Sequence, residues 1–281
     1  MQTLVAFALA TAVWAQGPAG PAAGAGTRPE GDAERKRRLE EFAADAAKYE
    51  VALLTPKPTR LELLAQPVLN WEGSAFVWLK DGRPEVIGAL WKTVNARSGQ
   101  LEYGHAFHSL SERPITARFN GQLVWSPQTA GLQFRPVEGA EAAAGDSRRR
   151  LVQLRSLARE FSAIQWKGGR KQLRMLTQPI YHYEPSAGIA KEGAIFAFTN
   201  TEFGTDPDAL LVLEARQADG KLRWEYAFAR FHYAELSGNH RDKEVWRVAD
   251  TWPQRKLHVF GADPGRDSVY YSVVRTGGLP P

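Results

Sequence analysis

The sequence predicts an α+β protein built by tandem duplication of one unit, in which an N-terminal amphipathic helix packs on a curved antiparallel sheet of five or six strands. The main observation is a ten-residue stretch that occurs twice, at 63–72 and 175–184. Gln-Pro, an aliphatic residue, an aromatic residue and Glu recur in it 112 positions apart (178 − 66). A helix-like pattern precedes each copy and strand-like patterns follow it. A mainly-β sandwich or barrel is the alternative fold.

The first unit, 29–144, opens with a predicted helix. Gly31 and Asp32 offer its N-terminal cap, and apolar residues then follow in steps of three and four, which places them on one face. Pro56 and Pro58 predict its end, because proline cannot continue a helix. The stripe comprises Leu39, Phe42, Ala46, Tyr49 and Leu53.

Six strands are predicted after this helix. Their segments are rich in β-branched and aromatic residues and are separated by turn signals such as Asp81-Gly82 and Asn120-Gly121. Short strands joined by tight turns favour an antiparallel meander. The predicted ranges are 62–72, 75–79, 86–95, 101–109, 115–125 and 132–137.

The second unit, 145–281, repeats the first. Its predicted helix has the stripe Leu151, Leu154, Ala158 and Phe161, each 112 residues beyond its counterpart, and is expected to end at Gly168-Gly169. Beyond 184 the spacing changes: 194–196 aligns with 75–77 at an offset of 119, which places seven added residues (119 − 112) in the loop 185–193, and 220–228 aligns with 99–107 at 121. Length changes confined to turns indicate one ancestral unit.

Alternation within 222–228 predicts how helix and sheet meet. Leu222, Trp224, Tyr226 and Phe228 point to one side of a strand, and so aromatic a face must be covered. The unit's own helix has an apolar stripe that needs a partner, so we expect it to provide that cover. A helix followed by a strand meander is similar in outline to the cystatin-like and NTF2-like folds, without a shared motif. We expect the two units to pack about a pseudo-twofold axis.

The N-terminus predicts export. Residues 1–15 carry an apolar run that is too short for the roughly 20 residues of a bilayer span, and they resemble a secretory signal peptide. An Ala/Gly/Pro linker follows at 16–28. No other apolar stretch approaches membrane length, and the chain has no cysteine, so stability must come from packing. A secreted or periplasmic location follows.

The chain is basic, with a formal net charge of +5 and a pI of about 9.4. Acidic residues are interleaved with the Lys and Arg residues, which argues against nucleic acid as the partner. An envelope protein or an anionic polymer remains as the expected partner.

Retained polar residues are the first candidates for a binding site. Gln66 and Gln178, and Glu72 and Glu184, keep their identity in both copies of the repeated stretch. The structural explanation, which we favour, is that they satisfy backbone groups beside a proline. The functional alternative places the two glutamates near the pseudo-twofold axis, where paired carboxylates bind a cation or act as acid and base.

Histidines supply the other candidates. His105 and His108 are three positions apart on a predicted strand, so they face opposite sides of the sheet and do not predict a metal site. His182 and His232 have no histidine counterpart in the other unit and are further binding candidates. Asp206-Pro207-Asp208 resembles a bare turn more than a calcium site. We assign no catalytic residue, metal ligand or cofactor.

The sequence lacks the phosphate-binding Gly-rich loop, the Gly-x-Ser-x-Gly elbow and the His-Glu-x-x-His motif. It therefore favours an exported, non-enzymatic, two-repeat binding or structural module of the cell envelope. The alternative is a small-molecule-binding or hydrolytic pocket inside one cone-shaped unit, lined by residues such as His182, His232 or His240.

Overall fold

The computed structural model describes residues 31–54, 58–71, 73–94, 98–200, 206–251 and 267–276. The predicted signal peptide at 1–15, the predicted linker at 16–28 and the candidate Glu72 lie outside these ranges. Within them the fold is sheet-rich with two helices, which confirms a mixed fold dominated by antiparallel sheet.

The described residues of the first half form one helix and ten strands. The helix α1 covers Asp32–Ala47. The strands that follow are β1 Tyr49–Leu53, β2 Thr59–Arg60, β3 Glu62–Leu63, β4 Leu69–Asn70, β5 Gly73–Lys80, β6 Arg83–Val94, β7 Leu101–Ser109, β8 Ile115–Phe119, β9 Gln122–Trp125 and β10 Arg135–Pro136.

The second half contains the same kinds of element in the same order. The helix α2 covers Ser147–Ala158, and the Asp146 side chain caps it by accepting a hydrogen bond from the backbone N–H of Arg149 at 2.9 Å. The strands are β11 Phe161–Gln165, β12 Lys171–Gln172, β13 Arg174–Met175, β14 Tyr181–Tyr183, β15 Ala190–Thr199, β16 Pro207–Ala218, β17 Lys221–Arg230, β18 Leu236–His240, β19 Lys243–Val248 and β20 Tyr270–Thr276.

Each half forms one small and one large sheet. One edge strand of each large sheet comes from the other half of the chain. The small sheets have the orders β2-β1-β8-β9 and β12-β11-β18-β19. The large sheets have the orders β20-β7-β6-β5-β3 and β10-β17-β16-β15-β13, with β4 on β5 and β14 on β15. The strand β10 closes the first half yet pairs with β17, whereas β20, the last strand, pairs with β7. The two halves are therefore joined by hydrogen bonds in both directions.

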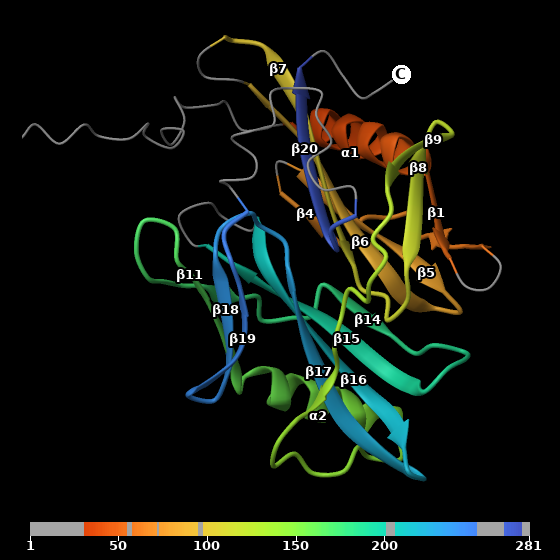
Figure 1. Cartoon of the computed structure of the whole chain (residues 1–281), viewed down its shortest axis with the longest axis vertical. Coiled ribbons are helices and arrows are strands. Elements are labelled where there is room, and N and C mark those ends of the chain that lie inside the picture. Colours follow the sequence, from red (N-terminus) through yellow and green to blue (C-terminus); the bar gives the residue numbers. More distant parts are fainter. Residues whose placement is uncertain are drawn as a thin grey trace, which may run out of the picture.

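The elements stack in layers along the long axis of the molecule. Figure 1 shows α1 towards one end and α2 at the other, with the large sheets between them. Each helix packs with the small and large sheets of its own half around a core of aromatic and aliphatic side chains, as expected for the Trp224, Tyr226 and Phe228 face. The opposite faces of the large sheets meet in a third core, which contains residues such as Val77, Ile87, Ile195 and Leu210.

Both predicted helices are too long. The first ends at Ala47 and the second at Ala158, so Tyr49, Leu53 and Phe161 lie on strands β1 and β11. Along β1, buried residues alternate with more exposed ones, as expected for a strand. Residues four apart lie on the same face both in a strand, with its repeat of two residues, and in a helix, with its repeat of 3.6. The apolar pattern alone therefore predicted a helix that is too long.

The predicted offset of 119 between β5 and β15 is wrong by one residue. Leu69, on β4, pairs with Ala75, and its counterpart Tyr181 pairs with Ile195, an offset of 120 (195 − 75). Phe76 and Phe196 then both face a helix. Because one residue of slip moves every side chain to the other face of a strand, the core decides this register. The insertion in the second half is eight residues long (120 − 112).

The repeated Gln-Pro stretch is not a continuous strand. Gln66 and Gln178 lie at exposed bends between β3 and β4 and between β13 and β14, because proline has no N–H to donate to a sheet. The predicted strand 115–125 is a hairpin, β8 and β9, that turns at Asn120 and Gly121, both with positive φ. The predicted strand 132–137 forms only β10.

Charged side chains are buried where the halves meet. The Glu214 carboxylate, fully buried, accepts hydrogen bonds from Arg83 Nε at 2.8 Å, from the Tyr183 hydroxyl at 2.7 Å and from Arg216 Nη1 at 3.3 Å. Burial alone would lower the pKa of Arg83, but Glu214 and Glu85 raise it above its ordinary value. Phe134 packs against Arg216, with its ring centroid 4.2 Å from the guanidinium carbon. This cluster fixes how the large sheets face each other.

Replacing Glu214 with Gln tests this cluster. The amide cannot neutralise Arg83 and Arg216, so we expect the free energy of unfolding to fall by about 3 kcal/mol, as measured by chemical denaturation. Glu112→Gln is the matched control, because Glu112 binds the same Arg216 at 2.7 Å with a side chain that is 44% exposed, and exposed pairs contribute about 1 kcal/mol or less. Equal losses in the two variants would contradict the assigned role of Glu214.

Candidate functional site

Two of the predicted binding residues come together beside α2. His182 lies on β14 and Glu184 follows two positions later, so both point to the same side of the sheet. Tyr183 pairs with Gly193, which puts Glu192 of β15 across from Glu184. One ligand atom from each of His182, Glu184 and Glu192 lies within 4.8 Å of the other two. We call these three residues the His182 cluster.

Each carboxylate of the His182 cluster is held by a residue of α2. Arg150 Nε donates to Glu192 Oε2 at 2.5 Å, and Ser147 Oγ donates to Glu184 Oε1 at 2.6 Å. The second oxygen of Glu192, Oε1, lies 2.8 Å from His182 Nε2. The Glu192 side chain has no exposed surface, whereas that of His182 is 31% exposed. The cluster therefore opens to solvent on the side of His182 and Glu184.

Arg150 ties the cluster to the segment before α2. Its Nη1 donates to the carbonyl oxygens of Ala144 at 3.1 Å and Gly145 at 2.9 Å. A buried guanidinium that binds one carboxylate and two carbonyls is well compensated. Glu192 is accordingly held in one orientation, with Oε1 facing His182.

The corresponding place in the first half differs at the histidine position. Asn70 stands where the second half has His182, and it accepts a hydrogen bond from the Ser74 hydroxyl at 2.9 Å. Arg38, the counterpart of Arg150, donates instead to the carbonyl oxygen of Trp71 at 2.9 Å. Within the described residues the first half offers no such group of three ligands, because Asn70 replaces the histidine.

The other predicted candidates do not join this cluster. Gln66 and Gln178 lie at exposed bends. His232 lies between β17 and β18, where its Nδ1 accepts a hydrogen bond from the backbone N–H of Ala234 at 3.0 Å. Sequence reasoning missed Arg150 and Glu192. The repeat of Arg37-Arg38-Leu39 at 149–151 pointed to Arg150, but only strand pairing reveals Glu192.

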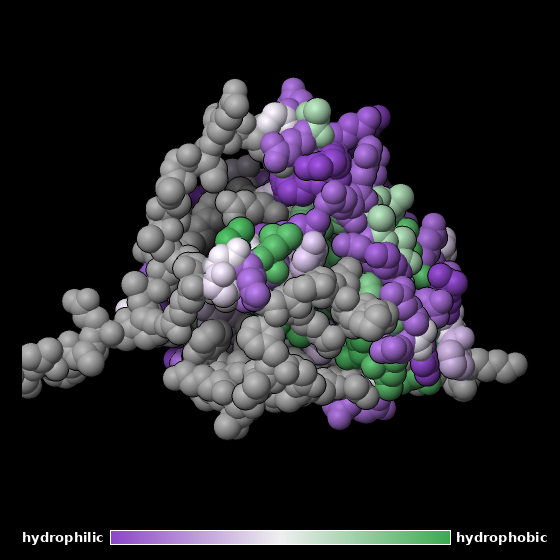
Figure 2. All heavy atoms as spheres, turned by 90° about the horizontal axis from the view of Figure 1, so that it is seen from above, coloured by the Kyte–Doolittle hydropathy of each residue, from purple (hydrophilic) through white to green (hydrophobic). Residues whose placement is uncertain are grey.

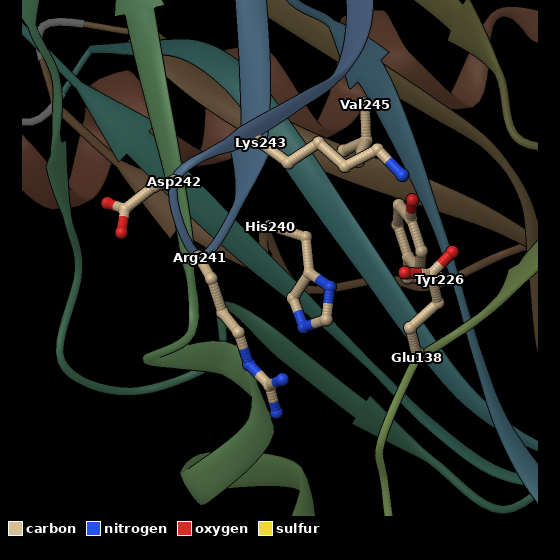
Figure 3. A pocket seen from close by; sticks show the side chains of 7 residues that line it. All are labelled: Glu138, Tyr226, His240, Arg241, Asp242, Lys243 and Val245. Atoms are coloured by element: carbon tan, nitrogen blue, oxygen red, sulfur yellow. The ribbon is translucent and has the colours of Figure 1, made fainter.

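A second feature is an open pocket of about 440 Å³ beside the β18–β19 hairpin. Figure 3 shows its lining, in which the Asp242 carboxylate points away from the other labelled side chains. The His240 ring stacks on Phe161 with centroids 4.6 Å apart, and its Nε2 lies 3.1 Å from Glu160 Oε2. The lining residues are Glu138, Tyr226, His240, Arg241, Asp242, Lys243 and Val245. The lining combines the Tyr226 and His240 rings with the cationic Arg241 and Lys243 and the carboxylate of Glu138.

The pocket lies over a ring cluster that both halves contain in rearranged form. Phe161, Tyr226 and His240 contact one another in the second half. The equivalent strand positions of the first half hold Tyr49, His105 and Phe119, which also contact one another. Each half thus places one Phe, one Tyr and one His at these three equivalent positions, but in a different order. Of the two histidines, His240 lines the pocket.

Two further buried groups have shifted pKa values. Burial, and secondly the charge of Asp206, raises the pKa of Asp208 to about 8. Asp208 is the second residue of β16 rather than part of a bare turn, and its Oδ2 accepts a hydrogen bond from Gln165 Nε2 at 2.8 Å. Burial lowers the pKa of His108 to about 4, and its Nδ1–H donates to the carbonyl oxygen of Ser109 at 2.7 Å. Both side chains are uncharged at neutral pH.

The raised pKa of Asp208 predicts a pH-dependent stability. Above about pH 4 the unfolded chain loses this proton while the folded chain keeps it until about pH 8, so the stability falls by about 1.4 kcal/mol per pH unit across that window. In Asp208→Asn we expect this component of the slope to disappear, as measured by denaturation at pH 4.5, 6 and 7.5. Asp219→Asn, in the exposed β16–β17 turn, should keep the wild-type slope. An unchanged slope in Asp208→Asn would contradict the assignment.

Comparisons with known proteins add no family to this description. No protein-family model matches the chain, and neither the curated proteins nor the solved structures contain a significant match. Within the part of the chain that the structure describes, neither helix has the length and apolar character required to cross a bilayer.

Proposed function

We propose that this protein is an exported, non-enzymatic, two-repeat module of the cell envelope that binds an anionic polymer through the outer face of α2. The observation that carries the proposal is the charge of this helix. Residues 147–159 include five arginines and no acidic residue. Export rests on the signal-like sequence at 1–15.

Four of the five arginines are exposed, and one of these, Arg149, pairs with Asp146 at 3.4 Å. Arg150 is directed inwards to Glu192, while the others lie on the side of α2 opposite the core. Arg148, Arg155 and Arg159 share one stripe with Val152, which is 68% exposed. At 1.5 Å per residue the stripe extends over about 16 Å. Guanidinium groups in such a row match the carboxylate, sulfate or phosphate groups of a linear polymer.

Other surfaces fit a polyanion less well. Both faces of each large sheet are buried, one against a helix and one against the other sheet. The outer face of α1 carries both signs of charge, as shown by the pair between Lys36 and Glu40. Figure 2 looks onto the α1 end of the molecule, where hydrophilic and apolar residues are interspersed.

We also propose that the units 29–144 and 145–281 arose by duplication. The identical element order, the matching strand orders of the sheets and the reciprocal exchange of β10 and β20 support this history. The packing of one helix in each half against a large sheet is in keeping with a cystatin-like or NTF2-like outline. In this proposal the α2 surface is an acquired property of one copy, because Ala43 and Ala47 stand where the second copy has Arg155 and Arg159.

A triple variant, Arg148→Gln/Arg155→Gln/Arg159→Gln, tests the binding surface. We expect its affinity for heparin or polyglutamate at low salt to fall at least tenfold, because the charges that face the polymer are gone. Wild-type binding should weaken as salt is raised. Surface plasmon resonance at several salt concentrations provides the measurement.

A matched control removes the same charge from α1. Arg35→Gln/Lys36→Gln/Arg37→Gln also takes the net charge from +5 to +2 (5 − 3), and these residues are exposed. It should retain most of the affinity. If the two triple variants lose affinity equally, binding reflects net charge and the α2 proposal fails.

The pocket beside His240 supports a second candidate function, the binding of a small anionic or polar molecule. Its cationic side chains and the Tyr226 and His240 rings offer both charge and stacking. His240→Phe copies Phe119 of the first half and should preserve stacking on Phe161 while removing the imidazole. Ligand-observed NMR would first identify small carboxylates or phosphates that bind the wild type. We expect the variant to bind them at least tenfold more weakly. Ligands that bind both forms equally would exclude this pocket.

A further inference from the structure

We propose that the His182 cluster is a binding site for one Zn²⁺ ion, formed by His182 Nε2, a Glu184 carboxylate oxygen and Glu192 Oε1. The proposal is independent of the polymer-binding surface on α2. It rests on the ligand types, on their placement by strand pairing and on the hydrogen bonds that orient them.

The ligand set suits zinc. One imidazole nitrogen and two carboxylate oxygens, with a water molecule in the fourth position, form a common arrangement at open zinc sites. Calcium and magnesium prefer sites made of oxygen alone. The exposure of His182 and Glu184 leaves room for the water molecule.

Strand geometry brings the three ligands to one point. His182 and Glu184 are two apart on an extended segment, in contrast to His105 and His108, which are three apart on β7. Glu192 faces Glu184 from β15. The three ligand atoms lie within 4.8 Å of one another, and tetrahedral zinc at bond lengths near 2.1 Å needs separations of about 3.4 Å. Side-chain rotations that move the ligand atoms by about 1 Å would bring them to these separations.

Charge gives an independent reason for a cation. Two carboxylates on opposite strands repel each other, and Glu192 is fully buried. Arg150 compensates one of the two charges by binding Glu192 Oε2. With a neutral imidazole the group of four side chains retains a net charge of −1 (1 − 2), which a bound cation offsets.

Outer hydrogen bonds hold the ligands in place. Arg150 leaves Oε1 of Glu192 directed at His182, and the Ser147 hydroxyl fixes one oxygen of Glu184 while the other remains available. Donors of this kind orient metal ligands and strengthen binding. Both come from the first turn of α2, so the ion would join this helix to the sheet.

Calorimetric titration of the chain with ZnCl₂ tests the site. We expect one ion per chain, with at least a tenfold loss of affinity in His182→Asn and in Glu184→Gln. Asn is the residue at the corresponding position 70, and Glu184 is exposed, so both variants should fold; circular dichroism checks this. Zinc should also raise the melting temperature of the wild type but not of the variants.

His240→Asn is the matched control. His240 also faces a glutamate, Glu160, at 3.1 Å, but among the described residues no third ligand completes a set there. This variant and the triple arginine variant of α2 should bind zinc like the wild type, which separates the two proposals. The proposal is overturned if His182→Asn binds as tightly as the wild type, if no saturable site exists, or if equimolar Ca²⁺ displaces the zinc.

Discussion

The burial of the two large sheets against each other is the constraint on which the rest of the structure depends. Their strands are apolar on both faces, with Phe76 and Phe196 towards the helices and Ile87 and Leu210 towards the opposite sheet. A sheet of this kind is stable only when both sides are covered. One helix covers one side, so the second half must cover the other, and neither half has a complete core alone.

The exchange of edge strands joins the two halves by backbone hydrogen bonds as well as by packing. Because β10 pairs with β17 and β20 with β7, each large sheet needs a strand from the other half. The buried carboxylate of Glu214 then selects one orientation, since Arg83 comes from the first half and Arg216 from the second. Partners and ligands are consequently left with the helices, the turns and the open pocket.

The candidate binding features lie mainly in the second half. The His182 cluster has a histidine where the first half has Asn70, and Arg155 and Arg159 of α2 stand where α1 has Ala43 and Ala47. Most of the pocket lining also comes from this half, where His240 takes the position of Phe119, whereas Glu138 comes from the first half.

The sequence by itself determined the sheet-rich mixed fold, the start of the first helix and the aromatic face of 222–228 that a helix covers, because these follow from local periodicity. It also identified His182 and Glu184 as candidates. Only the tertiary structure decided where the helices end, since Tyr49 and Phe161 fit both periods, and the register of β15, which the cores fix at an offset of 120. The same holds for Glu192, because a residue on the neighbouring strand becomes part of a site only through pairing between strands. The Gln-Pro stretch, the strongest sequence signal, marks a bend between short strands because proline cannot donate the hydrogen bond that a strand requires.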